Sequence, residues 1–352
     1  MYEEKILIGT DTTSGIAPQI LDAIAEASHT KTLPYGNDIF TEECKNIVKN
    51  IFEKSDLEII PMVSGTASNS LALSSFLRSY GSIICHSDSH INKDEGGAPE
   101  FFSGGGKLLT ISNSLGRIKA RDIQKKIDEI NFKRKSSSLI SGISITQLAE
   151  NGTIYTLDEI DAISEICKTN NLYLHMDGAR FSNALVSQEL ISPAEATWKV
   201  GVDCLSLGAT KNGAMAAELI IFFNKTLAIE AQNHIKQTGH VISKTRFVSA
   251  QLNAWFKDGL WLELAKLANK KALYLRNQLT EFNDFKILYP TQGNEVFVKM
   301  SNSSYDNILK LNIIPNLWNK IDNDYLVVRF VTSFETNISQ IDEIINRLKT
   351  YF

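Results

Sequence analysis

Short apolar segments alternate with amphipathic stretches between residues 59 and 223, and this alternation restricts the fold more than any other feature of the chain. The apolar segments are short and mostly apolar at every position, which is typical of strands covered on both faces. The expected strands are Ile59–Val63, Ser82–Cys85, Leu139–Ile145, Leu172–Met176, Cys204–Leu207 and Leu219–Phe223, and the clearest helices are Ser68–Tyr80, Ala120–Ile130 and Leu157–Asn170. The pattern predicts βαβ units, and therefore an α/β fold with a mostly parallel central sheet sandwiched by helices.

The pattern changes after about Arg246, where a long helical stretch replaces the alternation. The later elements are expected as a helix over Phe247–Phe282 broken near Asp258 and Gly259, strands at Glu295–Met300 and Tyr325–Val331, and a final helix at Ile338–Tyr351. This order predicts a smaller C-terminal α+β domain. We therefore divide the 352 residues into a large domain, 1–246, whose N-terminal segment packs on the small domain, and a small domain, 247–352.

Composition excludes several function classes. A net charge of −4, from 36 basic and 40 acidic side chains, gives no positive surface for nucleic acid. The four cysteines have no paired metal-ligand spacing and indicate buried, reduced thiols, so no metal site is expected. Residues 1–11 lack the basic start and apolar core of a signal peptide, and no apolar run is long enough to span a membrane. We expect a soluble, cytoplasmic protein.

Two polar residues at strand ends carry the strongest chemical signal. Asp177 follows the apolar segment Leu172–Met176, at the edge of the sheet where α/β proteins bind ligands. A buried carboxylate there needs a cationic partner, and a protonated pyridine nitrogen is one. Lys211 follows the next strand, 34 positions later, among small residues, as a lysine linked covalently to a flat aldehyde cofactor would. The alternatives are a helix-capping aspartate and a surface lysine.

Two weaker signals lie upstream. Gly65 and Thr66 stand between a strand and a helix, where backbone N–H groups can bind a phosphate. His90 precedes the glycine-rich stretch Gly96–Gly106 and could stack on a cofactor ring or move protons. His175, two residues before Asp177 on the same strand face, is expected to be a hydrogen-bond donor behind the site rather than a base. Each of these signals has a plain structural explanation when taken alone.

Together these motifs resemble a known family. The stretches Pro34–Asp38, Gly65–Leu73, His90–Lys107, His175–Asn183, Gly208–Gly213 and Val328–Ser333 are similar to those of the L-threonine aldolases, most closely the low-specificity aldolases of bacteria. The resemblance covers nearly the whole chain. It implies the aspartate-aminotransferase-like fold, fold type I of the pyridoxal 5'-phosphate (PLP) enzymes. It also implies cleavage of L-threonine or L-allo-threonine, a small amino acid, to glycine and acetaldehyde.

The resemblance also implies a role for each matching residue. Lys211 would hold the cofactor covalently and Asp177 would pair with its ring nitrogen, while His90 would stack on the ring and could act in catalysis. Gly65 and Thr66 would bind the phosphate. Arg180 would contact the phenolic oxygen or the substrate carboxylate, and Arg329 would bind that carboxylate with its bidentate guanidinium. A homodimer or homotetramer with active sites at the subunit interface is expected as well.

Three positions depart from the family pattern. Thr10 stands where many members have serine, so a threonine hydroxyl would touch the substrate. Lys236 stands where many members place an arginine of a neighbouring subunit on the phosphate. The stretch 147–152 lacks the histidine that many members direct toward the substrate hydroxyl. The general base is therefore left open between His90 and a water molecule near the phosphate.

Other functions share parts of this pattern. A β-eliminating lyase or an aminotransferase would use the same ring-binding residues and would differ in its products. A non-catalytic protein of this fold would have little reason to keep both Lys211 and Asp177 buried. A nicotinamide dehydrogenase is disfavoured, because no G-x-G-x-x-G follows the first strand.

Overall fold

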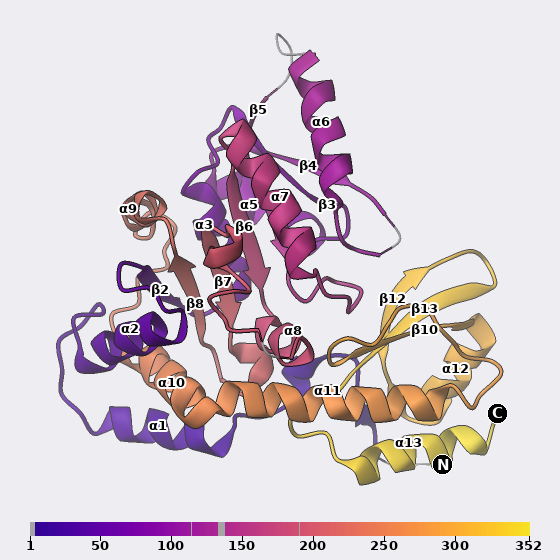
Figure 1. Cartoon of the computed structure of the whole chain (residues 1–352). Coiled ribbons are helices and arrows are strands. Elements are labelled where there is room, and N and C mark those ends of the chain that lie inside the picture. The colour runs from indigo at the N-terminus through magenta and orange to yellow at the C-terminus, as the bar shows by residue number, and fades with distance from the viewer. Residues whose placement is uncertain (1–3, 114, 133–137, 190) are drawn as a thin grey trace.

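The computed structural model describes residues 4–113, 115–132, 138–189 and 191–352. Its centre is a seven-stranded sheet in the order β2-β8-β7-β6-β5-β3-β4 (Figure 1). The strands are β2 (Glu58–Met62), β3 (Gly81–His86), β4 (Lys107–Ile111), β5 (Leu139–Thr146), β6 (Tyr173–Gly178), β7 (Cys204–Gly208) and β8 (Glu218–Phe222). The predicted α/β class and mostly parallel sheet are confirmed. Strand β8 is the exception, since it runs antiparallel to both β2 and β7.

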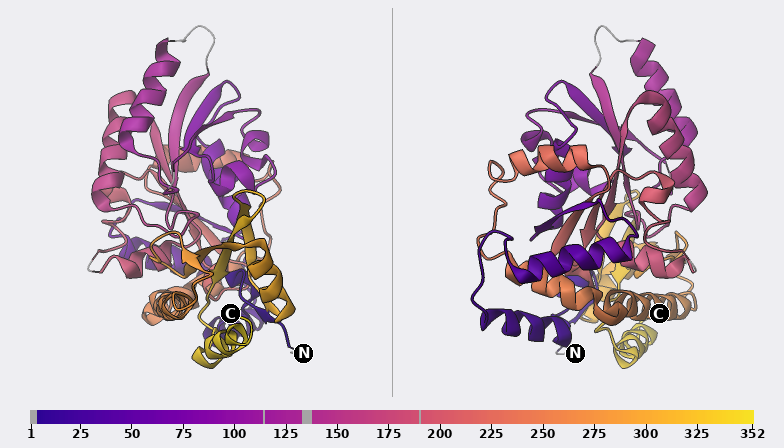
Figure 2. Two further views of the ribbon diagram at one scale, coloured as in Figure 1. Left: turned by 90° about the vertical axis from the view of Figure 1, so that its right-hand side faces the viewer. Right: turned by 60° about the vertical axis from the view of Figure 1, so that its left-hand side comes forward.

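Helices cover both faces of this sheet, as the apolar strands predict. In β3, Ile83 and Cys85 pack on the side of α3 (Gly65–Ser74) and α9 (Lys225–His234), whereas Ile84 packs on the other side. The second face is covered by α2 (Ile39–Ile51), α6 (Ala120–Phe132), α7 (Leu157–Asn170) and α10 (Arg246–Phe256). Figure 2 shows the helices on both sides of the strands. Successive side chains of a strand therefore point to opposite faces of the sheet and pack in two separate apolar layers.

Local sequence signals explain where the helices begin and end. Helix α7 begins at a capping box in which Thr156 and Glu159 exchange hydrogen bonds, and it ends before Asn171, whose φ is 54°. Helix α3 begins after Ser64, whose side chain accepts from the Ala67 N–H. The expected helix Ser68–Tyr80 is wrong in extent. Helix α3 ends at Ser74, because the Ser74 and Ser75 hydroxyls bind carbonyl oxygens of the last turn.

A second, smaller sheet lies beside the first. It has the order β12-β13-β10-β9, formed by β9 (Lys286–Ile287), β10 (Glu295–Ser301), β12 (Asn316–Lys320) and β13 (Tyr325–Val331). Around it lie α11 (Leu260–Leu279), α12 (Asn302–Lys310), α13 (Ile338–Lys349) and the short β11 (Ile313–Ile314), which pairs in parallel with β1 (Ile6–Leu7). The remaining helices include α1 (Pro18–Ser28), α4 (His90–Lys93), α5 (Ala98–Phe102) and α8 (Phe181–Ser187).

One long helical segment joins the two sheets. Helix α11 follows α10 after the short turn Lys257–Gly259, in which Asp258 has a φ of 52°. The predicted break at Asp258 and Gly259 is confirmed. Figure 1 shows α11 passing beneath the large sheet and reaching the small one. The described residues contain no helix that is both long and apolar enough to cross a membrane.

The fold gathers the polar residues of interest at one edge. The parallel strands β2, β3, β5, β6 and β7 all end at the same edge of the large sheet, and β8 begins there. The segments that carry the predicted site residues follow these ends. The small sheet stands opposite this edge in Figure 1, so that a cavity can form between them.

Candidate active site

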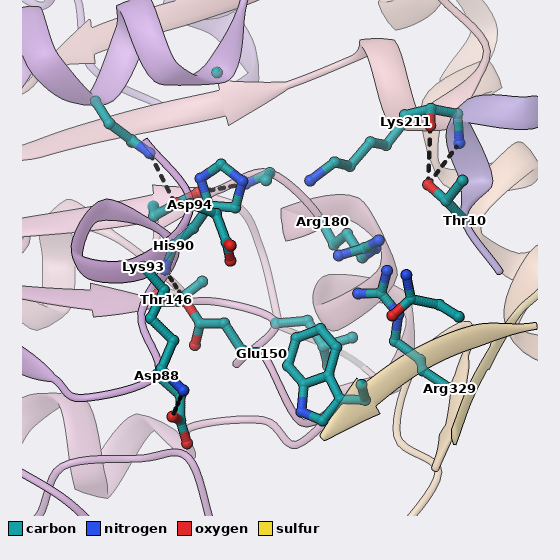
Figure 3. Close-up of a pocket in the computed structure, with 18 of the residues that line it drawn as sticks. Thr10, Asp88, His90, Lys93, Asp94, Thr146, Glu150, Arg180, Lys211 and Arg329 are labelled. Atoms are coloured by element: carbon teal, nitrogen blue, oxygen red, sulfur yellow. Dashed lines mark hydrogen bonds and ion pairs between the residues drawn. The ribbon is translucent and has the colours of Figure 1, made fainter. Parts of the chain in front are cut away.

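A cavity of about 610 Å³ lies between the carboxyl edge of the large sheet and the strands β12 and β13. This volume is within the range of ordinary small-molecule and cofactor sites. The cavity is lined by Thr10, Gly65, His90, Asp177, Arg180, Lys211 and Arg329 among the predicted residues. Figure 3 shows several of these side chains turned toward one another from different elements.

Asp177 lies near the end of β6 and is almost fully buried. Its Oδ2 accepts a hydrogen bond from Asn69 Nδ2 at 2.8 Å, and its Oδ1 accepts from the Ala179 N–H at 3.0 Å. Both donors are neutral. A buried carboxylate held by neutral groups and open to a cavity is suited to receive a cationic partner.

His175 lies two residues earlier on β6 and has a different set of partners. Its ring nitrogens form hydrogen bonds with Ser144 at 2.9 Å and Ser206 at 3.0 Å, so both nitrogens are engaged away from Asp177. Burial lowers the pKa of His175 to about 4, and the ring is neutral at physiological pH. It links β5, β6 and β7 beneath the site.

Lys211 lies in the turn after β7, the strand beside β6. Its side chain is half-buried and extends into the cavity, as Figure 3 shows. The pairing of neighbouring strands brings the two segments together, because Asp177 stands opposite Ser206 in the register. The two residues that sequence reasoning linked through one βα unit thus line one cavity.

The first turn of α3 contributes an anion-binding geometry. Helix α3 begins at Gly65, and a side chain added there would meet no atom within 4 Å, so the backbone is open on the cavity side. Thr66, the next residue, is half-buried. Free N–H groups at the start of a helix attract phosphate.

His90 begins the short helix α4, where the sequence predicts a loop. Its Nδ1 lies 2.9 Å from Oε1 of Glu95, a carboxylate whose side chain is fully buried. Asn69 donates to the same oxygen at 2.8 Å. The hydrogen bond with Glu95 raises the pKa of His90, and burial raises the pKa of Glu95. The two groups are coupled through this hydrogen bond, so they titrate as a pair.

Two arginines and two acids form a buried cluster on the side of the small sheet. Arg180 binds Asp11 through Nε at 2.7 Å and Nη2 at 3.1 Å, and its Nη1 lies 3.4 Å from Glu295. Arg329 lies 3.2 Å from the same Glu295 oxygen. Burial opposes the charge of Arg180, but Asp11 and Glu295 outweigh it and raise its pKa. Burial lowers the pKa of Arg329.

The remaining predicted residues lie in two places. Thr10 lines the cavity, and its hydroxyl bonds to the Thr12 hydroxyl at 2.9 Å. Lys236 is exposed, after the end of α9, and does not line the cavity of this single chain. Arg329 is further held by Trp318 of β12, whose ring lies 4.8 Å from the guanidinium carbon.

Several residues of the site were missed by sequence reasoning. Burial raises the pKa of both Glu150 and Glu218 to about 7, and the negative charge of Asp177 adds to this in each case. Asp177 was singled out because it stands at the edge of the sheet where the parallel strands end. The same reasoning applies to Glu150, which follows β5, and to Glu218, which begins β8. Asn69 gave a fainter signal, as one of four polar residues in the buried part of α3. Trp318 gave none.

The residues present fit a flat, anionic aldehyde cofactor with a basic ring nitrogen. Asp177 offers a carboxylate that forms no ion pair with a described residue, and Lys211 offers an amine in the same cavity. Gly65 leaves room at a helix start, and Asn69 Oδ1 and Glu95 Oε2 are buried polar atoms with no hydrogen-bond partner in the described part of the chain. Among the described residues, no group of three or more His, Cys, Asp and Glu side chains could hold a metal ion.

Comparison with known proteins gives a consistent set of relatives. The profile of the Beta-eliminating lyase family matches residues 8–303. A low specificity L-threonine aldolase from Pseudomonas sp. (strain NCIMB 10558) is 40% identical over 304 residues, which cover 86% of each chain. A low specificity L-threonine aldolase from Saccharomyces cerevisiae is 24% identical, over 84% of this chain and 74% of that one.

Solved structures are also similar. The threonine aldolase of Leishmania major is 27% identical with a TM-score of 0.91, covering 98% of this chain and 99% of that one. The histidinol-phosphate aminotransferase of Clostridium acetobutylicum is 18% identical with a TM-score of 0.72, covering 99% and 98%. At this low identity, the likeness to the aminotransferase shows a shared fold alone.

Proposed function

Because this chain belongs to the family of the low-specificity L-threonine aldolases, within the beta-eliminating lyases, we propose that it cleaves L-threonine and L-allo-threonine into glycine and acetaldehyde. It is a carbon–carbon lyase with fold type I of the PLP enzymes, and its cofactor is pyridoxal 5'-phosphate. Nothing in the comparisons favours an aminotransferase or a β-eliminating reaction over this one.

The observation that carries the proposal is the presence of Asp177 and Lys211 at the ends of adjacent strands, facing one cavity. When bound, the cofactor supplies an electron sink for the bond that breaks at Cα. Asp177 would hold the protonated ring nitrogen of the cofactor through a charge-assisted hydrogen bond. Lys211 would hold the cofactor covalently through its amine.

Arginines bind the carboxylate of the substrate. Arg329 is the main ligand, and Arg180 assists it or contacts the phenolic oxygen of the cofactor. What supports this role is that both guanidinium groups line the cavity and are held in place, Arg180 by Asp11 and Arg329 by Trp318. A carboxylate fixed in this way would set the orientation of the bonds at Cα in the cavity. Thr10 supplies a hydroxyl to the substrate.

The phosphate of the cofactor binds at the start of α3, through Gly65 and Thr66. Lys236 contributes from a neighbouring copy of the chain, in a homodimer or homotetramer with active sites at the subunit interface. His90 would contact the cofactor ring. We further propose a division into two domains between residues 246 and 247, after the first residue of α10, and a cytoplasmic location. All four cysteines are free and buried, which suits a reducing compartment.

The test is a product assay on purified protein with the cofactor added. L-threonine, L-allo-threonine and L-serine are supplied separately, and acetaldehyde, glycine and keto acids are measured. Each threonine isomer should give acetaldehyde and glycine, one molecule of each per molecule of substrate. Formation of a keto acid and ammonia in their place would show β-elimination and contradict the proposal.

A further inference from the structure

A carboxyl group that has no role in the reaction so far lines the cavity beyond the end of β5. Glu150 follows Thr146, the last residue of that strand, by four positions. Its Oε1 accepts hydrogen bonds from the Thr146 hydroxyl at 2.8 Å and from the His90 backbone N–H at 3.0 Å, as Figure 3 shows. Its Oε2 is shielded from solvent and has no partner among the residues that the structure describes. A shielded carboxylate oxygen is costly without a donor, and a substrate hydroxyl is such a donor.

The loop that carries Glu150 is fixed in place. The Gln147 N–H donates to the Asp177 carbonyl at 2.8 Å, and the Ala149 N–H donates to the Thr153 carbonyl at 2.9 Å. The Gln147 side chain also exchanges two hydrogen bonds with the backbone of Tyr155. Gln147 and Ala149 are at most 1% exposed. A side chain on such a support keeps its position when a substrate binds.

His90, the other residue considered as a base, is poorly prepared for that task. Its Nδ1 already forms a hydrogen bond of 2.9 Å with Glu95 Oε1, and that bond raises the pKa of the ring. A raised pKa means that a smaller share of the molecules has the neutral ring that can accept a proton. When the ring is protonated, both nitrogens carry hydrogen, and Nε2 donates to an oxygen and removes no proton.

We infer that Glu150 is the general base that removes the β-hydroxyl proton of the substrate, a role that rests on the proposed function. As Oε2 takes this proton, the O–H bonding pair becomes the second C–O bond of the aldehyde. The Cα–Cβ bond breaks with its electron pair on the glycine fragment. That fragment gains one proton at Cα, and Glu150 returns its proton to solvent. The two products then contain every atom of the substrate.

The charge state of Glu150 suits this task. Burial is the main cause that raises its pKa to about 7, and Asp177 on β6 raises it further. A base with a pKa near the working pH is ionised in a useful fraction and still accepts a proton readily. The other ionisable groups around it are His90 on α4, Cys85 on β3, Tyr155 after the loop, and Lys211 and Arg329 across the cavity. Activity should therefore rise with pH through about 7.

The test compares the loaded wild-type enzyme with Glu150→Gln in two reactions. Glutamine keeps the size of the side chain and an oxygen for Thr146 and His90, but removes the basic oxygen. Cleavage of L-threonine should fall roughly 10²- to 10⁴-fold in kcat with little change in KM, and the rise of kcat/KM near pH 7 should disappear. Exchange of the glycine α-hydrogen in D₂O uses no hydroxyl proton, so it should stay within about threefold of wild type.

Two control variants and one spectrum complete the test. Glu150→Asp keeps a carboxylate and should retain more cleavage than the glutamine variant. Asp88→Asn removes an exposed acid at the mouth of the same cavity, paired with Lys93, and should change cleavage by no more than about threefold. In wild-type minus Glu150→Gln infrared difference spectra, a carboxylic-acid band should titrate near pH 7, with or without the cofactor.

Three outcomes would overturn the inference. Glu150→Gln could cleave L-threonine at close to the wild-type rate. It could lose cleavage and glycine exchange in equal measure, in which case Glu150 maintains the site as a whole. The infrared band could titrate near the ordinary value of 4.5. A wild-type enzyme that exchanges the glycine hydrogen but does not cleave threonine would refute the proposed function itself, whatever Glu150 does.

Discussion

The buried cluster of Asp11, Arg180, Glu295 and Arg329 gives a prediction whose size can be worked out. Glu295 is 1% exposed, and one of its oxygens lies 3.4 Å from Arg180 and 3.2 Å from Arg329. With an effective dielectric constant of about 20, each contact is worth roughly 5 kcal/mol of Coulomb energy. The cost of burying the carboxylate offsets several kcal/mol of this sum.

The perturbation is Glu295→Gln, which keeps the volume and leaves two arginines facing one acid. Removing one partner of a buried ion pair usually costs about 3–5 kcal/mol, and we expect the lower end because glutamine can still bond to a guanidinium. The free energy of unfolding should fall by about 3 kcal/mol, which lowers Tm by roughly 4 °C in a chain of this size. Differential scanning calorimetry and urea titration measure both quantities.

The same variant should bind the substrate carboxylate more tightly. The cluster changes from balanced to one excess positive charge, so KM for L-threonine should fall while stability drops. Glu343→Gln is the matched control, since Glu343 is 44% exposed and Arg347 keeps its bonds to backbone carbonyls. The control should cost less than about 1 kcal/mol. Stability changes of equal size in the two variants would refute this reasoning.

Three further predictions concern the cofactor edge of the cavity. Lys211→Ala should lose the visible absorbance of the covalently held cofactor together with activity, and turnover of threonine at near the wild-type rate would exclude its assigned role. Asp177→Asn removes a charge-assisted hydrogen bond, so kcat/KM should fall roughly 10- to 100-fold, as steady-state kinetics can measure. Glu218→Gln should stabilise the cofactor-free protein in a pH-dependent way. The folded pKa of Glu218 is raised from 4.5 to about 7, so wild type loses stability between these values as pH rises, and the variant should gain roughly 3 kcal/mol above pH 7 in urea titrations but nothing below pH 4.5.

The strands of the large sheet could be predicted from the sequence because each is buried on both faces. An apolar run such as Leu219–Phe223 differs from β8, Glu218–Phe222, by one residue at each end. The direction of β8 could not be predicted, since pairing partners do not appear in a local pattern. Strand β12, Asn316–Lys320, was missed for another reason. Its side chains are mostly exposed, so it carries no apolar signal.

The candidate site shows the same division between local and long-range information. Asp177 and Lys211 were found because strand ends in an α/β sheet share one edge. The donor to Asp177, Asn69, lies 108 positions away, and nothing in the local pattern of α3 links the two. Glu150 was missed because its burial depends on packing, and burial is what raises its pKa. Local sequence patterns thus indicate which residues lie at the site, whereas tertiary packing determines how buried they are and therefore whether they are charged.

The most direct test of the central claim is to identify the lysine that holds the cofactor. The loaded enzyme is reduced with borohydride, which fixes the link between cofactor and protein, and the digested protein is mapped by mass spectrometry. The account predicts one pyridoxyl group per chain, on the peptide that contains Lys211. A label on another lysine, or none after saturation with the cofactor, would contradict it.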